Sequence, residues 1–548
     1  MAQLILGPLL RYVGEHEATV WVETDAPCEV EVLGRGARTF RIGAHHYALV
    51  CIDGLETGST TTYDVKLDGE PRWPPPNDSF PAPVIRTLDP DATIRLAFGS
   101  CRVAVPHHHP FSMRKDDDPQ GREIDALYAL ALRMCEEPHE RWPHVILMLG
   151  DQIYADETSP GTQAFIRARR DTSRPPGLQV ADFEEYTRLY YDSWQDPTIR
   201  WLLSTVSSAM IFDDHDVHDD WNTSAAWLAE YREKPWWNER IVGAFSSYWL
   251  YQHIGNLSPR ELSEDEVFGA VRGAQDGQPV LDEFSYRADR ESAGARWSFC
   301  RDLGRSKLLM MDSRAGRVLE GDDRRSMIDD VEWRWIEEQT TGDFDHLFLG
   351  TSLPFLLGRG MHYLEAWNEA VCDGAWGSAA ARLGEKVRQA VDLEHWAAFG
   401  ESFERLAGLV EAVGAGRRGG SPASIVVLSG DVHHAYLAEV GFRRGAEVAS
   451  NVYQAVCSPL RNPLDRREQV ALRFAASKTG EALGRALARS AGAPDPPIRW
   501  RFTHKPWFDN QIATIEIDGR RARLTIDKAI VGDAHVPRLE CVLERDLA

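Results

Sequence analysis

The stretch HVILMLGD, residues 144–151, decides the fold. It is a short apolar run that ends in a Gly-Asp turn signal, which is typical of a strand covered on both faces. Longer helical stretches separate it from similar runs, which are IRLAFGS (94–100), SAMIFDD (208–214), SKLLMMDS (306–313), HLFLGTS (346–352) and SIVVLSGD (424–431). Buried strands that alternate with helices predict a layered α/β fold. Because QIATIEIDGRRARLTIDKA near the end of the chain resembles an antiparallel hairpin, we expect mixed sheets.

The first part of the chain has another pattern. Residues 1–85 contain short segments with alternating apolar residues, such as EATVWVET and TTYDVKLDG, and predict a small β-sandwich of immunoglobulin or fibronectin type. The order of Leu55, Gly58 and Tyr63 is similar to the tyrosine corner of such sandwiches. A proline-rich linker follows. With 548 residues in all, we expect this sandwich and a larger α/β domain with helical insertions over residues 92–548.

Composition excludes several classes of protein. The net charge of −23 disfavours nucleic acids and anionic membranes as partners, and no apolar run is long enough to predict a membrane span. The eight cysteines lack the spacing of a disulfide framework or a zinc site. The first residues lack the pattern of an export signal. We therefore expect a cytoplasmic protein with reduced cysteines, and the sequence leaves its oligomeric state open.

Ionisable side chains follow four of the apolar strands. Ligand sites in layered α/β folds lie beyond the carboxyl ends of strands, so we expect these groups to converge. So many carboxylates repel one another unless cations lie between them. The residues are, in chain order, Cys101 and Arg102, then Asp151 and Tyr154, then Asp213, Asp214, His215 and Asp216, and finally Asp431, His433 and His434.

A pair of metal ions is the simplest source of that positive charge. The oxygens of Asp151, Asp214 and Asp431 suit Ca²⁺, Mg²⁺ or Mn²⁺, whereas the Cys101 thiolate and the His433 imidazole suit iron or zinc. In two-metal sites the ions lie about 3.5–4 Å apart, and Asp151 is the candidate for a bridging carboxylate. Each residue also has a structural alternative as a core cysteine, a turn aspartate, a helix cap or a packed histidine. These structural alternatives would have to hold at all four strand ends together, which disfavours them.

The ordered motifs resemble the alkaline phosphatase D (PhoD-like) family of the metallophosphoesterase superfamily. The resemblance implies a metallophosphoesterase domain over residues 92–548 that hydrolyses a small phosphate diester, a monoester or both. A hydroxide held between the metals is the expected nucleophile. The matching stretches are FGSCR (98–102), GDQIYAD (150–156), FDDHDVHDDWN (212–222), MDSR (311–314) and SGDVHHAY (429–436).

The resemblance also implies a role for individual residues. His215 is the implied catalytic histidine, which protonates or stabilises the leaving group. A thiolate and a phenolate favour Fe³⁺ at one site, and the oxygen-rich second site indicates Ca²⁺, with Mn²⁺, Zn²⁺ or Mg²⁺ as alternatives. The implied ligands of this binuclear or larger centre are Cys101, Asp151, Tyr154, Asp214, Asp431 and His433.

Three neighbouring residues are further candidates. Arg102 either binds phosphate oxygens or forms a structural ion pair. Asn222 and Arg314 are weaker candidates for a supporting role, and a structural salt bridge is the better interpretation of Arg314.

Two other functions remain as alternatives. In the first, a non-catalytic binding protein uses the sandwich and a tryptophan-rich cleft, and its metals are structural. The tryptophans concerned either form that cleft or pack as a helical insertion, which we favour; they are Trp221, Trp227, Trp236, Trp237 and Trp249. The second is an iron oxygenase, which needs two histidines and one carboxylate and is disfavoured by Cys101 and Tyr154.

Overall fold

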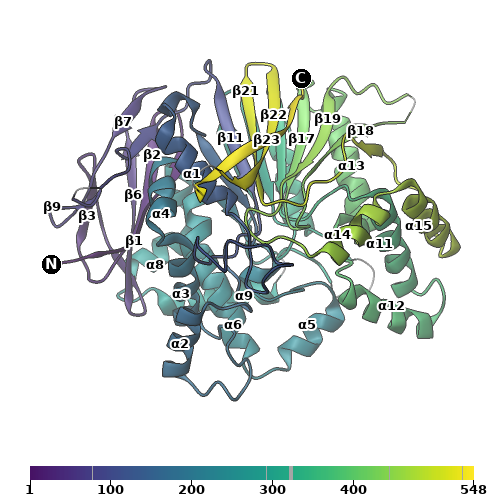
Figure 1. The fold of residues 1–548 in the computed structure, drawn as a ribbon, viewed down its shortest axis with the longest axis horizontal. Coiled ribbons are helices and arrows are strands. Elements are labelled where there is room, and N and C mark those ends of the chain that lie inside the picture. Colours follow the sequence, from purple (N-terminus) through teal and green to yellow (C-terminus); the bar gives the residue numbers. More distant parts are fainter. Residues whose placement is uncertain (77, 292, 320–324, 444, 533–534) are drawn as a thin grey trace.

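The computed structural model describes residues 1–548 except 77, 292, 320–324, 444 and 533–534. Figure 1 shows an N-terminal β region at one side, two sheets in the centre, and helices α11 to α15 at the other side. Mixed sheets flanked by helices confirm the predicted α/β class.

Two four-stranded antiparallel sheets form the N-terminal β-sandwich. Valines of β2 and β3 share one hydrophobic core between the sheets, as the alternating pattern predicts. The first sheet contains, in spatial order, β1 (Leu4–Val13), β2 (Glu17–Thr24), β6 (His45–Asp53) and β5 (Phe40–Ile42). The second contains β4 (Arg35–Arg38), β3 (Glu29–Val32), β8 (Val65–Leu67) and β9 (Glu70–Trp73), and β7 (Thr60–Thr62) pairs with β10 (Val84–Arg86).

The first central sheet has six strands. Its parallel strands β11 (Ile94–Gly99), β12 (Val145–Leu149) and β13 (Ser207–Ile211) carry three of the predicted site motifs at their carboxyl ends. The predicted hairpin is present as β21 (Gln511–Asp518) and β22 (Arg521–Val531), and β21 pairs with β11. The strand β23 (Pro537–Asp546) completes the sheet beside β22.

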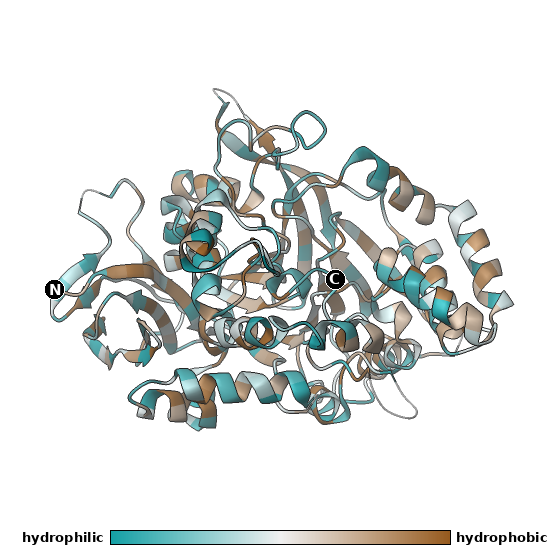
Figure 2. Ribbon diagram, turned by 90° about the horizontal axis from the view of Figure 1, so that it is seen from below, coloured by the Kyte–Doolittle hydropathy of each residue, from teal (hydrophilic) through white to brown (hydrophobic). Residues whose placement is uncertain are grey.

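The second central sheet has seven strands. Phe348 of β16 and Val426 of β17 share a core with Leu147 of β12, so the two sheets pack face to face. The alternate residues Leu347 and Ile425 point into a second core on the other face. Hydrophobic residues accordingly line the central strands in Figure 2. The spatial order is β14 (Phe299–Leu303), β15 (Ser306–Met311), β16 (His346–Thr351), β17 (Ser424–Ser429), β19 (Asn451–Val456), β18 (Tyr436–Gly441) and β20 (Arg499–Phe502).

Helices cover the outer faces of these sheets. Those before β14 are α1 (Ala126–Glu136), α2 (Pro160–Arg169), α3 (Phe183–Trp194), α4 (Pro197–Thr205), α5 (Ala225–Arg232), α6 (Trp237–Ser247), α7 (Pro259–Glu264), α8 (Glu266–Gly273) and α9 (Gln278–Arg290). Those after it are α10 (Asp330–Gln339), α11 (Arg359–Cys372), α12 (Ser378–Ala390), α13 (Gly400–Gly414), α14 (Arg466–Ala475) and α15 (Lys478–Ser490). In the described part of the chain, none of these helices is both long and apolar enough to cross a bilayer.

The tryptophan cluster packs inside the helical insertion. Trp221, Trp227, Trp237 and Trp249 are each at most 5% exposed, and Trp236 is half-buried. This burial supports the packing interpretation over an open tryptophan-lined cleft.

The sandwich is joined to the α/β region by direct contacts. Strand β1 lies against β13 and α4. The Tyr63 hydroxyl donates to the carbonyl of Ser204 at the end of α4. The tyrosine-corner interpretation was therefore wrong, because this hydroxyl bonds to the neighbouring region instead of returning to its own sandwich.

Candidate metal centre

The turns after β11, β12 and β17 lie against one another. The N–H of Asp431 donates to Ser100 Oγ at 3.0 Å, and the N–H of Cys101 donates to the Gly150 carbonyl at 3.3 Å. A Cβ atom on Gly430 would lie 2.1 Å from Ser100 Oγ, so only glycine permits this approach. The predicted convergence of strand ends is therefore present in the fold.

Four of the predicted ligands have a left-handed backbone. Non-glycine residues rarely adopt this conformation, which costs about 1–3 kcal/mol and is concentrated at functional sites. The residues are Cys101 (φ 54°), Asp151 (φ 51°), Asp431 (φ 63°) and His433 (φ 50°). Strain at each of these turns indicates that the side chains are held in place for a purpose other than stability.

Buried carboxylate oxygens without partners mark the centre of the cluster. Asp151, Asp213 and Asp214 each offer an oxygen within 4.8 Å of the others. Among the described residues, Asp151 Oδ1 and Asp213 Oδ2 have no hydrogen-bond partner. Burial raises the pKa of Asp151 well above its usual value, and the nearby charge of Asp214 raises it further. A buried, unpaired carboxylate is costly, so this donor set fits a metal cation.

Cys101 and Tyr154 are buried beside this carboxylate group. Burial raises the pKa of the Cys101 thiol well above its usual value, and the charges of Asp151 and Asp431 add to that effect. Burial, followed by the charge of Asp151, likewise raises the pKa of the Tyr154 hydroxyl. A bound cation reverses this preference because it stabilises thiolate and phenolate.

Asn462 links two of the predicted ligands. Its Nδ2 donates to the Tyr154 hydroxyl at 3.3 Å, and its carbonyl accepts a hydrogen bond from His433 Nδ1 at 2.7 Å. Because Nδ1 is the donor, Nε2 of His433 keeps its lone pair for a metal, a common arrangement for ligand histidines.

Arg314 lies among four carboxylates. It is fully buried and pairs closely with Asp213. Its other partners are Glu394 at 2.5 Å, Asp214 at 3.1 Å and Asp431 at 3.8 Å. The salt-bridge interpretation of Arg314 thus describes its position, and this guanidinium fixes the carboxylates of Asp214 and Asp431 in place.

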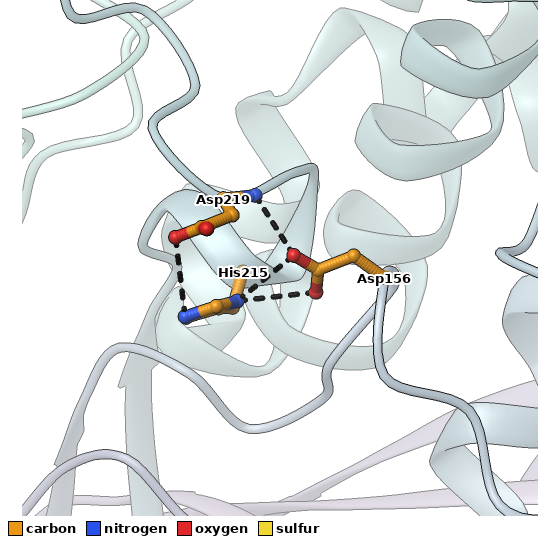
Figure 3. Close-up of side chains that lie close together, drawn as sticks. All are labelled: Asp156, His215 and Asp219. Atoms are coloured by element: carbon orange, nitrogen blue, oxygen red, sulfur yellow. Dashed lines mark hydrogen bonds and ion pairs between the residues drawn. The ribbon is translucent and has the colours of Figure 1, made fainter. Parts of the chain in front are cut away.

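His215 is held by two aspartates that the sequence did not single out (Figure 3). Its Nδ1 lies 3.1 Å from Asp156 Oδ1, and its Nε2 lies 3.6 Å from Asp219. The N–H of Asp219 donates to Asp156 at 3.1 Å. Although burial alone would lower the pKa of His215, Asp156 and Asp214 raise it well above its usual value. The imidazolium form suits a proton donor. Asp156 belongs to the GDQIYAD motif, which was the available signal.

His395 is a second histidine near the centre, and no residue pattern predicted it. Its Nε2 lies 3.1 Å from Asp431 Oδ2, and its Nδ1 lies 2.7 Å from Glu365. His395 comes from the helical segment between β16 and β17, whose folding could not be derived from residue patterns.

Arg102 and Asn222 support the surrounding turns. Arg102 is buried, pairs with Asp125 at 2.8 Å and donates to the Ser193 carbonyl at 2.9 Å. The contacts of Arg102 are therefore those expected of a structural ion pair. The side chain of Asn222 donates to the Arg314 carbonyl.

The sequence also matches a known family over more than half of the chain. A sequence profile of the PhoD-like phosphatases matches residues 127–488. This chain belongs to the PhoD-like phosphatase family. The matched range contains every predicted ligand of this PhoD-like phosphatase except Cys101, which precedes it. A second profile, described as a domain of unknown function (DUF7800), matches residues 1–85.

Two solved structures are similar to this chain. The structure of PhoD has a TM-score of 0.57 at 13% identity and covers 99% of this chain and 92% of that chain. Purple acid phosphatase PPD1 from yellow lupin (Lupinus luteus) seeds has a TM-score of 0.47 at 9% identity, with 95% and 71% covered. A comparison with curated proteins gives no match. This PhoD-like phosphatase therefore shares the fold of PhoD, and its family makes it a phosphoesterase hydrolase.

Proposed function

We propose that this PhoD-like phosphatase hydrolyses small phosphate diesters, monoesters or both at a centre of two or more metal ions. The observation that carries the proposal is the pair of buried oxygens, Asp151 Oδ1 and Asp213 Oδ2, without partners among the described residues. Family membership supports the reaction class. The proposed ligands are Cys101, Asp151, Tyr154, Asp214, Asp431 and His433.

The donor types support a mixed metal centre. Cys101 and Tyr154 would hold Fe³⁺, Asp214 and Asp431 would hold Ca²⁺, and Asp151 would bridge the two. Mn²⁺, Zn²⁺ or Mg²⁺ are alternatives for either position. Bound metals would supply Lewis-acid activation of water and of phosphoryl oxygens. Asp213 is close enough to Asp151 to be an additional ligand, beyond those that the family resemblance implies.

The side chains around the centre have separate tasks in this proposal. His215 delivers a proton to the leaving oxygen, since Asp156 and Asp214 favour its imidazolium form. Asp156 also fixes the orientation of the ring. Arg314 pairs with Asp214 and Asp431 and holds both carboxylates in place. Arg102 supports the turn after β11 through Asp125 and does not need to contact the substrate.

The remaining properties follow from composition. A net charge of −23 supports a small substrate over a nucleic acid. The eight cysteines are free, which supports the proposed cytoplasmic location.

Metal analysis combined with two chromogenic substrates tests the proposal. We expect stoichiometric metal in the purified protein and visible absorption from ferric phenolate. We also expect hydrolysis of bis(p-nitrophenyl) phosphate, of p-nitrophenyl phosphate or of both, which a chelator stops and added metal restores. Hydrolysis that persists after complete metal removal would refute the metal-dependent mechanism.

A further inference from the structure

A buried hydrogen-bond path runs from the sandwich toward the candidate metal centre. It begins at Arg11 on β1, which is 0% exposed. Its guanidinium donates to the carbonyls of Tyr251 and Gln252, the latter at 2.6 Å. Both carbonyls belong to η3 (Tyr248–His253), a π-helical turn that follows α6. A Cβ on Gly255 would lie 2.4 Å from Arg11 Cζ, so the glycine makes room for this guanidinium.

The path continues through the side chain of Gln252. Its Nε2 donates to Asp216 Oδ1 and to the Tyr190 hydroxyl, both at 3.0 Å. Asp216 Oδ2 accepts the N–H of Asp151 at 3.0 Å and the N–H of Asp213 at 2.9 Å. One carboxylate therefore ties together the turns that follow β12 and β13. These turns carry the two unpartnered oxygens of the centre.

One residue, Gln252, connects Arg11 to Asp216. It lies in a π-helical turn, which is rare and is frequently found at functional sites. Arg11 supplies donors to two carbonyls of that turn, and one of them belongs to Gln252, whose side chain reaches Asp216. Asp216 in turn holds the strained, left-handed backbone of Asp151.

We propose that Arg11 and Gln252 are positioning residues for the metal-binding turns, and that the sandwich is part of the active-site scaffold. This proposal rests on the proposed function. Arg11 acts through Gln252 and Asp216 and does not touch metal or substrate. The domain of unknown function thus contributes a strand whose arginine sets the geometry of Asp151 and Asp213.

Arg301 of β14 provides a matched control. It is also a buried arginine, 4% exposed, and it donates to the carbonyls of Gly255 at 2.8 Å and Asn256 at 3.2 Å. Those carbonyls follow η3, so Arg301 braces the same interface without reaching Gln252 or Asp216. A purely structural role of the interface predicts equal effects of Arg11→Met and Arg301→Met.

The test measures Mn²⁺ binding to the metal-free full-length chain by titration calorimetry, together with kcat, KM and the melting temperature. Loss of residues that orient metal ligands weakens metal binding roughly 10- to 100-fold. We expect a loss in this range, and a fall in kcat at nearly constant KM, for Arg11→Met and for Gln252→Met. Arg301→Met should lower the melting temperature but keep Mn²⁺ affinity within about two-fold, since Arg301 meets the path at the backbone carbonyl of Arg11, at 3.3 Å, and not at the Arg11 guanidinium, Gln252 or Asp216.

A double-mutant cycle tests the shared path. Arg11→Met and Gln252→Met should be non-additive in Mn²⁺ affinity, because the second change removes a link that the first has already loosened. Additive effects, or equal losses of affinity for Arg11→Met and Arg301→Met, overturn the proposal. If Arg11→Met does not fold, Gln252→Met alone decides, and unchanged Mn²⁺ affinity in that variant overturns it. The wild-type chain tests the proposed function separately. If it neither binds metal nor hydrolyses phosphate esters, the proposed function fails; if it does both and only the variants behave otherwise than expected, the positioning proposal alone fails.

Discussion

Two buried clusters of carboxylates differ in how their oxygens are satisfied. At the sandwich interface, Glu23 is 0% exposed, and both of its oxygens have partners. Oε1 accepts from His45 at 2.8 Å and from the Tyr191 hydroxyl, and Oε2 accepts from Tyr251 at 3.0 Å. At the strand ends, Asp151 Oδ1 is equally buried and has no partner in the described structure.

This difference separates a structural cluster from a functional one. A buried carboxylate whose two oxygens are both hydrogen-bonded is compatible with a stable fold, whereas a buried carboxylate oxygen without a partner is costly unless a cation binds. Glu23 therefore joins two regions of the chain, whereas Asp151 is a proposed metal ligand. Burial alone would not have distinguished them.

Asp151→Asn gives the largest expected effect and tests the comparison directly. We expect kcat/KM to fall by at least the roughly 100- to 1,000-fold that one lost transition-state contact costs, with metal content reduced. The metal-free variant should melt higher than the metal-free wild type, because a repelled carboxylate is neutralised. The matched change Glu23→Gln should do the opposite, lowering the melting temperature and leaving kcat/KM unchanged. A lower melting temperature for metal-free Asp151→Asn would contradict the comparison.

His215→Ala is expected to reduce kcat by about 100-fold or more, as for loss of a general acid, while the metal content stays that of the wild type. Asp156→Asn should reduce kcat less than His215→Ala does. It should also shift the pH dependence of kcat, since the His215 imidazolium loses a charged partner. Metal analysis and the pH profile of both variants are the measurements. Loss of metal from His215→Ala would make His215 a ligand instead.

The ionisation of His45 should make the stability of the interface cluster depend on pH. Although burial alone would lower its pKa, Glu184 and Glu23 raise it to about 9. Because the unfolded value is about 6.5, the stabilisation is complete below pH 6.5 and is lost as pH rises through 9. We expect the free energy of unfolding to fall by about 1–2 kcal/mol across this window, after allowing for solvent screening. Urea titrations at pH 6, 7.5 and 9.5 measure it, and His45→Gln should flatten this dependence.

Tyr63→Phe gives the smallest expected effect. It removes the hydrogen bond to the Ser204 carbonyl and should cost about 1 kcal/mol of stability. Turnover should stay at the wild-type value because Tyr63 lies outside the path from Arg11 to Asp216. Thermal melting and kcat, measured on the same preparation, check this; a fall in kcat would extend the positioning path to this contact.

Much of the candidate site could be predicted because it follows strands directly. An apolar run fixes a buried strand, and the residue after it must lie at the sheet edge, which located Asp151, Asp214 and Asp431. Asp156 and Asp216 were also within the quoted motifs, but their partners were not, since hydrogen bonds depend on which turns pack together. His395 could not be predicted, because residue patterns do not determine where a helical insertion packs relative to the strand ends.

The amino-acid sequence by itself determined the strands, the sandwich and the set of ionisable groups at the strand ends, because hydrophobic periodicity and turn residues act over a few positions. Only the tertiary structure decided which carboxylate is satisfied and which is left without a partner. That outcome depends on side chains hundreds of residues apart, as when Arg314 pairs with Asp213 or when Arg11 reaches the carbonyl of Gln252.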